Sequence, residues 1–416
     1  MSKTCEQALQ ALRPGMHLYV AGSVSEPRTL LLALAASPHA LAGVHVTTSF
    51  VPGLNHLGAQ AFTQAASVRV LMAGPPLLRA LGKRLRYVPM PWSQASAWLS
   101  SQRFDMAWFQ ATPPDARGRC SLGLGADFAS EVLTRSRSVV IETCDQLPRT
   151  KGHDSIEVGA HVVLVQGTDG PYRLDPVPAD DAALRIAERV AQLVRDGDTL
   201  QLGVGKLMGA AARGLRHHRH LGVHSGVIGD EIFELLACGA IDGRHKVRDA
   251  GVVVTAGIAG SEVALSALRS GAPVEVRPAR YTHDAALLAS QSRLVAMNGA
   301  LEVDLRGQVN VEWAAGRRVS SPGGFTDFIR GAQRAPHGRA LVLLQACTPS
   351  GASRIVPTLA TPSVTSPLDA PTVVTEFGTA DLRWLDECER AAALIAVAAP
   401  EHRDSLSRAA REMGLA

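Results

Sequence analysis

RDGDTLQLGVG (195–205) has the same plan as an earlier stretch of the chain, RPGMHLYVAG (13–22). Each reads as the end of a helix, a glycine turn and a strand that ends in glycine. Four more pairs follow in the same order: LAGVHV (41–46) with LGVHS (221–225), DARGRCS (115–121) with DLRGQVN (304–310), GADFAS (125–130) with FTDFIR (325–330), and VVIETC (139–144) with LVLLQAC (341–347). Offsets of about 180 to 200 residues, in one order, predict a duplicated chain.

Within each half, apolar strands alternate with amphipathic helical stretches, which is the pattern of an open sheet covered by helices. A chain of 416 residues is also long enough for two cores. The Pro-, Gly- and Asp-rich stretch 166–181 reads as a linker. We therefore predict an α/β fold with two related open-sheet domains, residues 1–178 and 179–416.

Composition narrows the class of protein. Hydrophobic residues make up 46% and charged residues 19%, with no apolar run as long as a membrane span and no export signal near the start. We expect a cytoplasmic protein without a membrane segment. A net charge of +4, with no basic run, argues against a nucleic-acid partner. Six scattered cysteines lack zinc spacing, and RHHRH (216–220) reads as a solvated helix end, so no metal is expected.

Open α/β sheets bind ligands beyond the carboxyl ends of their strands, so the glycine turns there are the candidate sites. A ligand oxygen reaches a backbone N–H most closely where no Cβ intervenes, as in QLGVG (201–205) and SPGGFTDF (321–328). Turn glycines without a function remain an equal alternative. GVGKLMG (203–209) has a spacing one residue too long for a dinucleotide fingerprint, and no acidic residue closes the next strand.

Several longer motifs resemble the acetyl-CoA hydrolase/CoA-transferase family, which includes 4-hydroxybutyrate CoA-transferases. They are PPDARGRCSLG (113–123), LPRTKG (147–152), ALEVDLRGQVN (300–310), SPGGFTDFIRGA (321–332), SRIVPTL (353–359) and VVTEFGTADLRW (373–384). The resemblance implies two α/β domains with the active site in the cleft between them. It also implies acyl-CoA and small carboxylates as substrates, with coenzyme A and no metal. A homodimer is the default for a bacterial enzyme of this size.

In that family a glutamate of the protein attacks the thioester and becomes a glutamyl-CoA thioester, which a second carboxylate then relieves. By resemblance, Gly324 is the backbone donor to the oxyanion, and Gly203 and Gly205 face it. The resemblance also places a further set of residues near CoA or its acyl group: Asn298, Gly299, Gly323, Phe325, Ser353 and Arg354.

The family glutamate is expected in a stretch of the form His-Thr/Ser-Glu, which here reads His224-Ser225-Gly226. The flanking residues match in register, so Gly226 takes the nucleophile's position. Two other departures are Phe325, where a glutamine is usual, and His283, where an asparagine is usual.

Three readings of the missing glutamate stay open at this level. Another carboxylate, Glu231 or Glu262, could serve as nucleophile, although an acid in the first turn of a helix is favoured by the helix dipole alone. The protein could instead hydrolyse acyl-CoA or transfer CoA directly, with His224 as a candidate base or simply a core histidine. It could also bind CoA without turnover.

Overall fold

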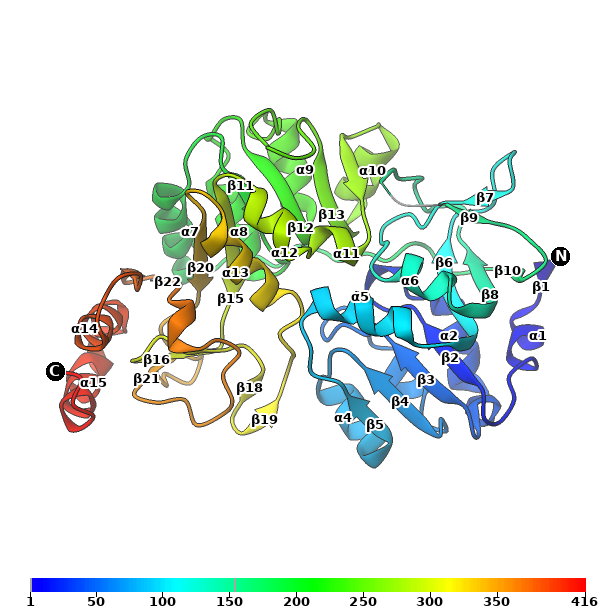
Figure 1. Cartoon of the computed structure of the whole chain (residues 1–416), viewed down its shortest axis with the longest axis horizontal. Coiled ribbons are helices and arrows are strands. Elements are labelled where there is room, and N and C mark those ends of the chain that lie inside the picture. The colour runs from blue at the N-terminus through cyan, green and yellow to red at the C-terminus, as the bar shows by residue number, and fades with distance from the viewer. Residues whose placement is uncertain (1, 153–154) are drawn as a thin grey trace. The chain divides into compact units, whose positions relative to one another are not determined.

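The computed structural model describes residues 2–152 and 155–416 of the chain (Figure 1). The chain divides into two compact units, which are described separately. The first contains Met1–Leu174, Val254–Thr282 and Arg318–Gly323, and the second contains Asp175–Val253, His283–Arg317 and Gly324–Ala416. The first unit's opening segment ends at Leu174, and the predicted boundary lies between 178 and 179. We predicted two continuous domains, whereas each unit consists of three segments.

The first unit is built on an eight-stranded sheet in which every neighbouring pair is parallel. Its strand order is β1 (Ser2–Lys3), β10 (Val162–Gln166), β8 (Ser136–Thr143), β6 (Phe104–Ala111), β2 (His17–Val20), β3 (His45–Thr48), β4 (Ser67–Val70), β5 (Leu85–Tyr87). The central strands are apolar runs, as expected for a parallel sheet covered on both faces.

Short helices and strands complete this unit. They are α1 (Cys5–Leu9), η1 (Ser23–Ser25), α2 (Arg28–Ala36), η2 (Pro38–Leu41), α3 (Gly58–Ala61), α4 (Pro75–Leu81), η3 (Gly82–Arg84), α5 (Trp92–Ser101), β7 (Arg119–Cys120), α6 (Ala129–Leu133) and β9 (Ile156–Glu157). The later segment adds β13 (Val253–Ile258), α10 (Glu262–Arg269), β14 (Val274–Val276) and α11 (Ala279–Thr282).

Backbone pairing explains why residues 254–282 group with the first unit. Gly125 and Gly257 form an isolated antiparallel bridge, and Lys151 and Glu275 form a parallel one. Two hydrogen bonds of 3.0 and 2.8 Å reinforce the first bridge, from Ala126 N to Ala256 O and from Ile258 N to Leu124 O. Pairing across more than a hundred residues leaves no local signal in the sequence, so the contiguous division could not anticipate it.

The second unit carries six strands of a sheet in the order β12 (Gly222–Ile228), β11 (Thr199–Gln201), β15 (Leu294–Gly299), β20 (Arg339–Leu343), β22 (Thr372–Thr375), β23 (Gly378–Asp381). The pairs from β12 to β22 are parallel, and β23 is antiparallel. Small strands follow β15, namely β16 (Glu302–Asp304), β17 (Val309–Asn310), β18 (Trp313–Ala314) and β19 (Arg317–Arg318), and β21 (Ile355–Val356) pairs with β16.

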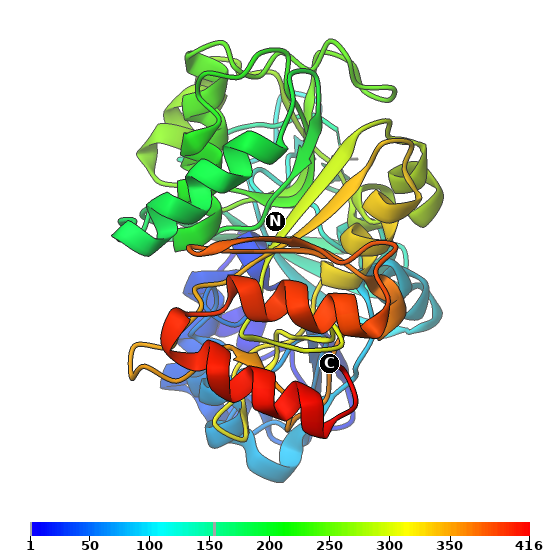
Figure 2. The same cartoon turned by 90° about the vertical axis from the view of Figure 1, so that its left-hand side faces the viewer.

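Helices cover this second sheet on both faces. They are α7 (Asp181–Leu193), α8 (Lys206–Gly214), α9 (Asp230–Ala237), α12 (Ala285–Ser290), α13 (Phe325–Arg334), η4 (Pro367–Asp369), α14 (Glu387–Val397) and α15 (Pro400–Glu412). Figure 2 shows α7 and α8 on one face and α12 and α13 on the other, with α14 and α15 side by side. A core cluster joins α13, α14 and α15 to β15, β20 and β22.

The two units share the strand order that a duplication predicts. The order β3, β2, β6, β8, β10 in the first corresponds to β12, β11, β15, β20, β22 in the second. The repeated motif also forms the same turn twice. Asp115 Oδ1 accepts hydrogen bonds from the N–H groups two and four residues on, and Asp304 Oδ1 does the same, at 2.9 to 3.1 Å. The duplicated α/β fold is thus visible in both topology and turn geometry.

Candidate active site

Several of the predicted site residues lie at or just after the carboxyl ends of strands in the second unit's sheet: Gly203 and Gly205 follow β11, Gly226 lies near the end of β12, and Asn298 and Gly299 end β15. Strand order reverses between β11 and β15, since the chain moves outward from β11 in one direction and from β15 in the other. Such a switch point is where open parallel sheets bind ligands. A pair of side-chain amides joins the two strands there: Asn298 Nδ2 donates to Gln201 Oε1 at 3.0 Å. This pair fixes the orientation of Asn298 at the end of β15.

Glycines border open space on both sides of this switch point. A Cβ placed on Gly205 or on Gly299 would meet no atom within 4 Å, and one on Gly203 would meet Met208 Cγ at 3.9 Å. Gly205 has φ +116°, a conformation that side-chain-bearing residues rarely adopt. A ligand could therefore approach the backbone closely at Gly205 and Gly299, and their assignment to CoA binding stays a prediction.

Strand β12 brings His224, Ser225 and Gly226 to the same edge. The Ser225 hydroxyl donates to Leu202 O at 2.5 Å and so ties the end of β11 to β12. His224 is fully buried within the strand, which favours the reading of a core histidine over that of a base. Gly226 is partly exposed.

An imidazole lies between Gly226 and Gly324. A Cβ on Gly226 would meet His283 Nε2 at 3.0 Å and Cε1 at 3.2 Å, and a Cβ on Gly324 would meet Nε2 at 2.5 Å. Phe328 Cε2 would lie 3.3 and 3.2 Å from the same two positions. The rings of His283 and Phe328 pack with centroids 4.7 Å apart. The structure thus joins two predicted site residues through a third residue that the sequence flagged only as unusual.

Helix α13 begins directly after Gly324, which is its N-cap and provides no side-chain hydrogen bond. The first N–H groups of such a helix have no partner within the helix and carry partial positive charge, which suits them to an oxyanion. Gly323 has φ +55° and turns the chain into the helix. Phe325 is 5% exposed and belongs to the core, so its side chain supports the helix and does not line an open surface.

The alternative carboxylates lie in settings with structural roles. The Glu231 oxygens lie 2.7 and 2.9 Å from the point where a Cβ on Gly229 would be, over the start of its own helix α9. Burial raises the pKa of Glu231, partly offset by a hydrogen bond from its own backbone N–H. Glu262 is half exposed in ion pairs with Arg173 at 3.1 Å and Arg269 at 2.6 Å. Both settings favour the reading in which these acids stabilise helix ends.

Ser353 and Arg354 follow β20 in a loop whose backbone is fixed. Arg354 N donates to Ala346 O at 2.8 Å, and Arg354 O accepts from Val303 N at 2.9 Å. The Ser353 hydroxyl donates to Ile355 O at 2.7 Å. The Ser353 hydroxyl proton is therefore engaged within the loop.

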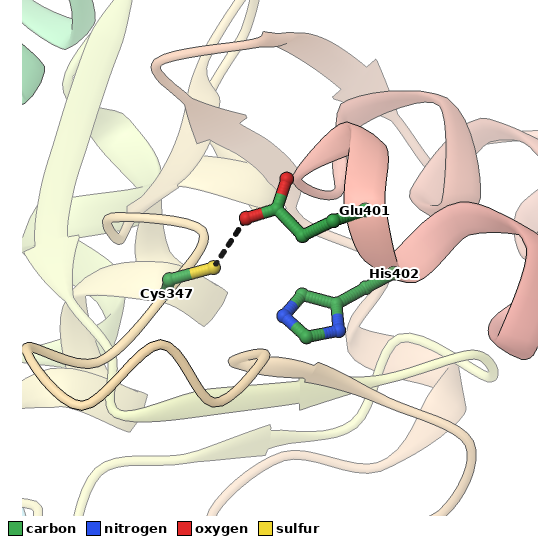
Figure 3. A group of neighbouring side chains, drawn as sticks. All are labelled: Cys347, Glu401 and His402. Atoms are coloured by element: carbon green, nitrogen blue, oxygen red, sulfur yellow. Dashed lines mark hydrogen bonds between the residues drawn. The ribbon is translucent and has the colours of Figure 1, made fainter.

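A cluster of Cys347, Glu401 and His402 places three potential metal-ligand atoms within 4.8 Å of one another among the described residues (Figure 3). The Cys347 thiol donates to Glu401 Oε1 at 3.9 Å, and His402 Nε2 lies 2.9 Å from Gly351 O. Burial, together with Glu401, raises the pKa of the Cys347 thiol. These hydrogen bonds account for the arrangement without an ion, and no metal binding is proposed.

Two residues at the site were missed by sequence reasoning. His283 was noted as a departure from the family pattern but was not assigned to the site, and Phe328 was not singled out. A signal for Phe328 exists, because residues four apart on a helix share a face and Phe328 follows Gly324 by four positions. No comparable signal places His283, which lies far from both glycines in sequence.

No helix within residues 2–152 or 155–416 is long and apolar enough to cross a membrane. Comparisons with known proteins cover almost the whole chain. The 4-hydroxybutyrate coenzyme A transferase of Clostridium kluyveri is 29% identical over 97% of this chain and 95% of its own length. The succinyl-CoA:cyclohexane-1-carboxylate CoA transferase of Geobacter metallireducens is 29% identical over 99% of this chain and 95% of its own length.

Solved structures agree with the fold. RipA from Yersinia pestis superposes with a TM-score of 0.92 at 27% identity, covering 100% of this chain and 98% of RipA. A 4-hydroxybutyrate CoA-transferase from Porphyromonas gingivalis gives 0.81 at 26% identity, covering 99% and 97%. The acetyl-CoA hydrolase/transferase N-terminal domain matches residues 2–185, and the C-terminal domain of the same family matches residues 260–410. The chain therefore belongs to the acetyl-CoA hydrolase/transferase family.

Proposed function

We propose that this protein transfers CoA between an acyl-CoA and a small carboxylic acid. The observation that carries the proposal is similarity over 97% and 99% of the chain to proteins named CoA transferases. The glycine-bordered edge of the second unit's sheet supports it, because Gly203, Gly205 and Gly299 leave backbone accessible where such sheets bind ligands.

The site favours direct transfer without a bond to the protein at position 226. Gly226 offers no side chain to attack the thioester, so the acceptor carboxylate attacks the acyl carbon itself. The C–S bond then breaks, CoA leaves as a thiolate, and a mixed anhydride remains. The thiolate attacks the acceptor's carbonyl carbon and releases the donor acid as a carboxylate. The two steps consume only the acyl-CoA and the acceptor carboxylate.

The chain's own contribution is to stabilise charge at the tetrahedral stage. The start of α13, where the N-cap Gly324 provides no side-chain hydrogen bond, presents N–H groups to an oxyanion. One such donor typically contributes about 3 to 4 kcal/mol to lowering the barrier. The neighbouring core residues Phe325 and Phe328 hold the helix end in place, so little reorganisation is needed during the reaction.

Hydrolysis is the second candidate, since water can take the acceptor's place at a site with no enzyme carboxylate. The products distinguish the two reactions. We would incubate purified protein with acetyl-, butyryl- and succinyl-CoA, with and without a panel of small carboxylates, and follow free thiol and new acyl-CoA together.

New acyl-CoA with little free thiol supports transfer. Thiol release at a rate that does not depend on the acceptor carboxylate supports hydrolysis. Neither product, with CoA binding detected by calorimetry, would contradict both enzymatic proposals and leave a binding protein. A Gly324→Val variant tests the contribution of the α13 N–H groups, because its side chain would meet His283 and displace the start of α13.

A further inference from the structure

The place beside Gly226, where the family resemblance predicts a glutamate side chain, is filled by His283. The nearest His283 atoms lie 3.0 and 3.2 Å from the position of a Cβ on Gly226. Contacts of this length are tighter than those that real Cβ atoms normally make, so a side chain at 226 requires the imidazole to move.

The imidazole has little room to move. His283 is 2% exposed, and the Phe328 ring, also 2% exposed, packs against it at 4.7 Å between centroids. On its other side Nε2 lies so close to Gly324 that a Cβ there would be 2.5 Å away. The next residue, Asp284, caps α12 by accepting from Leu287 N at 2.6 Å, which fixes the backbone beside His283.

Gly324 and Gly226 are therefore both small for the same reason. A side chain on either residue would meet the same buried ring, and its Cβ would also lie 3.3 Å (Gly226) or 3.2 Å (Gly324) from Phe328 Cε2. A side chain on residue 226 therefore competes with this ring for space and requires it to shift by a few tenths of an ångström. Interiors packed at protein density accommodate an added side chain only by displacing a neighbour.

We propose that His283 replaces the family's enzyme carboxylate in space, so that an enzyme-bound CoA thioester forms at position 226 only when Gly226→Glu is combined with His283→Asn. This rests on the proposed function in assigning the reaction to this site. It makes His283 a positioning residue that selects direct transfer. In the double variant the introduced carboxylate attacks the acyl-CoA, CoA leaves as a thiolate, and the thiolate then attacks the glutamyl carbonyl and releases the acyl group as a carboxylate.

Four proteins test this: wild type, Gly226→Glu, His283→Asn and the double variant. Each is incubated with acyl-CoA, and its intact mass is measured for a gain of one CoA less one water, with hydroxylamine trapping at the modified residue. We expect the adduct in the double variant and at least tenfold less in Gly226→Glu alone. Equal adduct in both, or none in a folded double variant that binds CoA, would overturn the proposal. So would an adduct on the wild type.

Thermal unfolding gives a second readout that needs no catalysis. Gly226→Glu is expected to lower the midpoint temperature, and adding His283→Asn is expected to return most of the loss. Gly299→Glu is the matched control, because its Cβ would face open space and its effect should not depend on residue 283. Additive effects of Gly226→Glu and His283→Asn would contradict the proposed contact.

Failure of the proposed function gives a different result. If wild type makes no new acyl-CoA while the double variant carries CoA, that result would support the steric role of His283 and refute direct transfer by the natural protein. If wild type transfers CoA without an adduct and the double variant also forms no adduct, the result supports direct transfer and refutes the proposed role of His283.

Discussion

Gly324 and Gly299 are both glycines at the carboxyl edge of one sheet, but their surroundings differ. A Cβ on Gly324 would lie 2.5 Å from His283 Nε2, and a Cβ on Gly299 would meet nothing within 4 Å. We predict that Gly324→Ala lowers the free energy of unfolding by about 1 to 3 kcal/mol, the usual cost of overpacking. Gly299→Ala should change it by less than about 1 kcal/mol.

Urea denaturation of the two variants measures this difference. The loss of unfolding free energy in Gly324→Ala should shrink when His283→Asn is added, because the new methyl group contacts the His283 ring. Equal stability of Gly324→Ala and Gly299→Ala would mean that the ring does not pack against Gly324 as described.

In the first unit, Glu26 is a buried carboxyl that titrates near neutrality. Burial raises its pKa from 4.5 to about 7, against the lowering effects of Arg28 and a hydrogen bond with Asn55. A raised folded pKa means that the native state holds the proton more tightly. The contribution of Glu26 to the free energy of unfolding is therefore fully present below pH 4.5 and is lost as the pH rises to about 7. The full difference is on the order of 3 kcal/mol.

Glu26→Gln should therefore flatten the fall in stability between about pH 5 and about pH 8, measured by urea denaturation at each pH. Asp127, whose pKa burial also raises to about 7, acts in the same direction, so Glu26→Gln with Asp127→Asn should flatten it further. An unchanged slope in the double variant would show that neither carboxyl holds a proton in the native state.

At this scale the sequence identified which positions were unusual but not that they touch. Gly226, His283 and Phe325 were each recognised as departures, and Gly324 was assigned by resemblance. The contact of one ring with both glycines depends on how β12, α13 and the segment before α12 fold together. Single positions carry no such information, so His283 could not be placed at the site.

At the scale of elements, the repeated turn offers a matched pair of glycines. Gly118 and Gly307 follow Asp115 and Asp304 by three residues and have φ +70° and +84°. A Cβ on Gly118 would meet nothing within 4 Å, whereas one on Gly307 would lie 2.7 Å from Leu382 Cδ1. We predict a loss of about 1 kcal/mol for Gly118→Ala from backbone strain, and a larger loss for Gly307→Ala because a contact is added.

Denaturation monitored for each variant separately gives the comparison, and Gly118→Ala serves as the control for strain alone. If Gly118→Ala loses more unfolding free energy than Gly307→Ala, the new methyl group at position 307 does not destabilise the protein through Leu382. The turn itself was predictable, since its residues repeat in the sequence, whereas the extra contact of Gly307 depends on the distant residue Leu382.

For the molecule as a whole, the sequence repeat predicted the duplicated α/β fold because each strand and turn is encoded locally. The order β3, β2, β6, β8, β10 recurs as β12, β11, β15, β20, β22. The composition of the units was less predictable. Residues 254–282 belong to the first unit, and backbone bridges such as that between Gly125 and Gly257 connect them to it. Local sequence patterns do not reveal pairing between segments that lie far apart in the chain.

Under the proposed function, CoA moves directly from donor to acceptor, with His283 in the place of an enzyme carboxylate. We would follow a single turnover with protein in excess and an acceptor carboxylate labelled with oxygen-18. Direct attack makes an acceptor oxygen the bridge of the anhydride, so the released donor acid should carry one labelled oxygen. An unlabelled donor acid, with the label found in a carboxyl group of the protein, would show transfer through an enzyme carboxylate and rule out direct transfer.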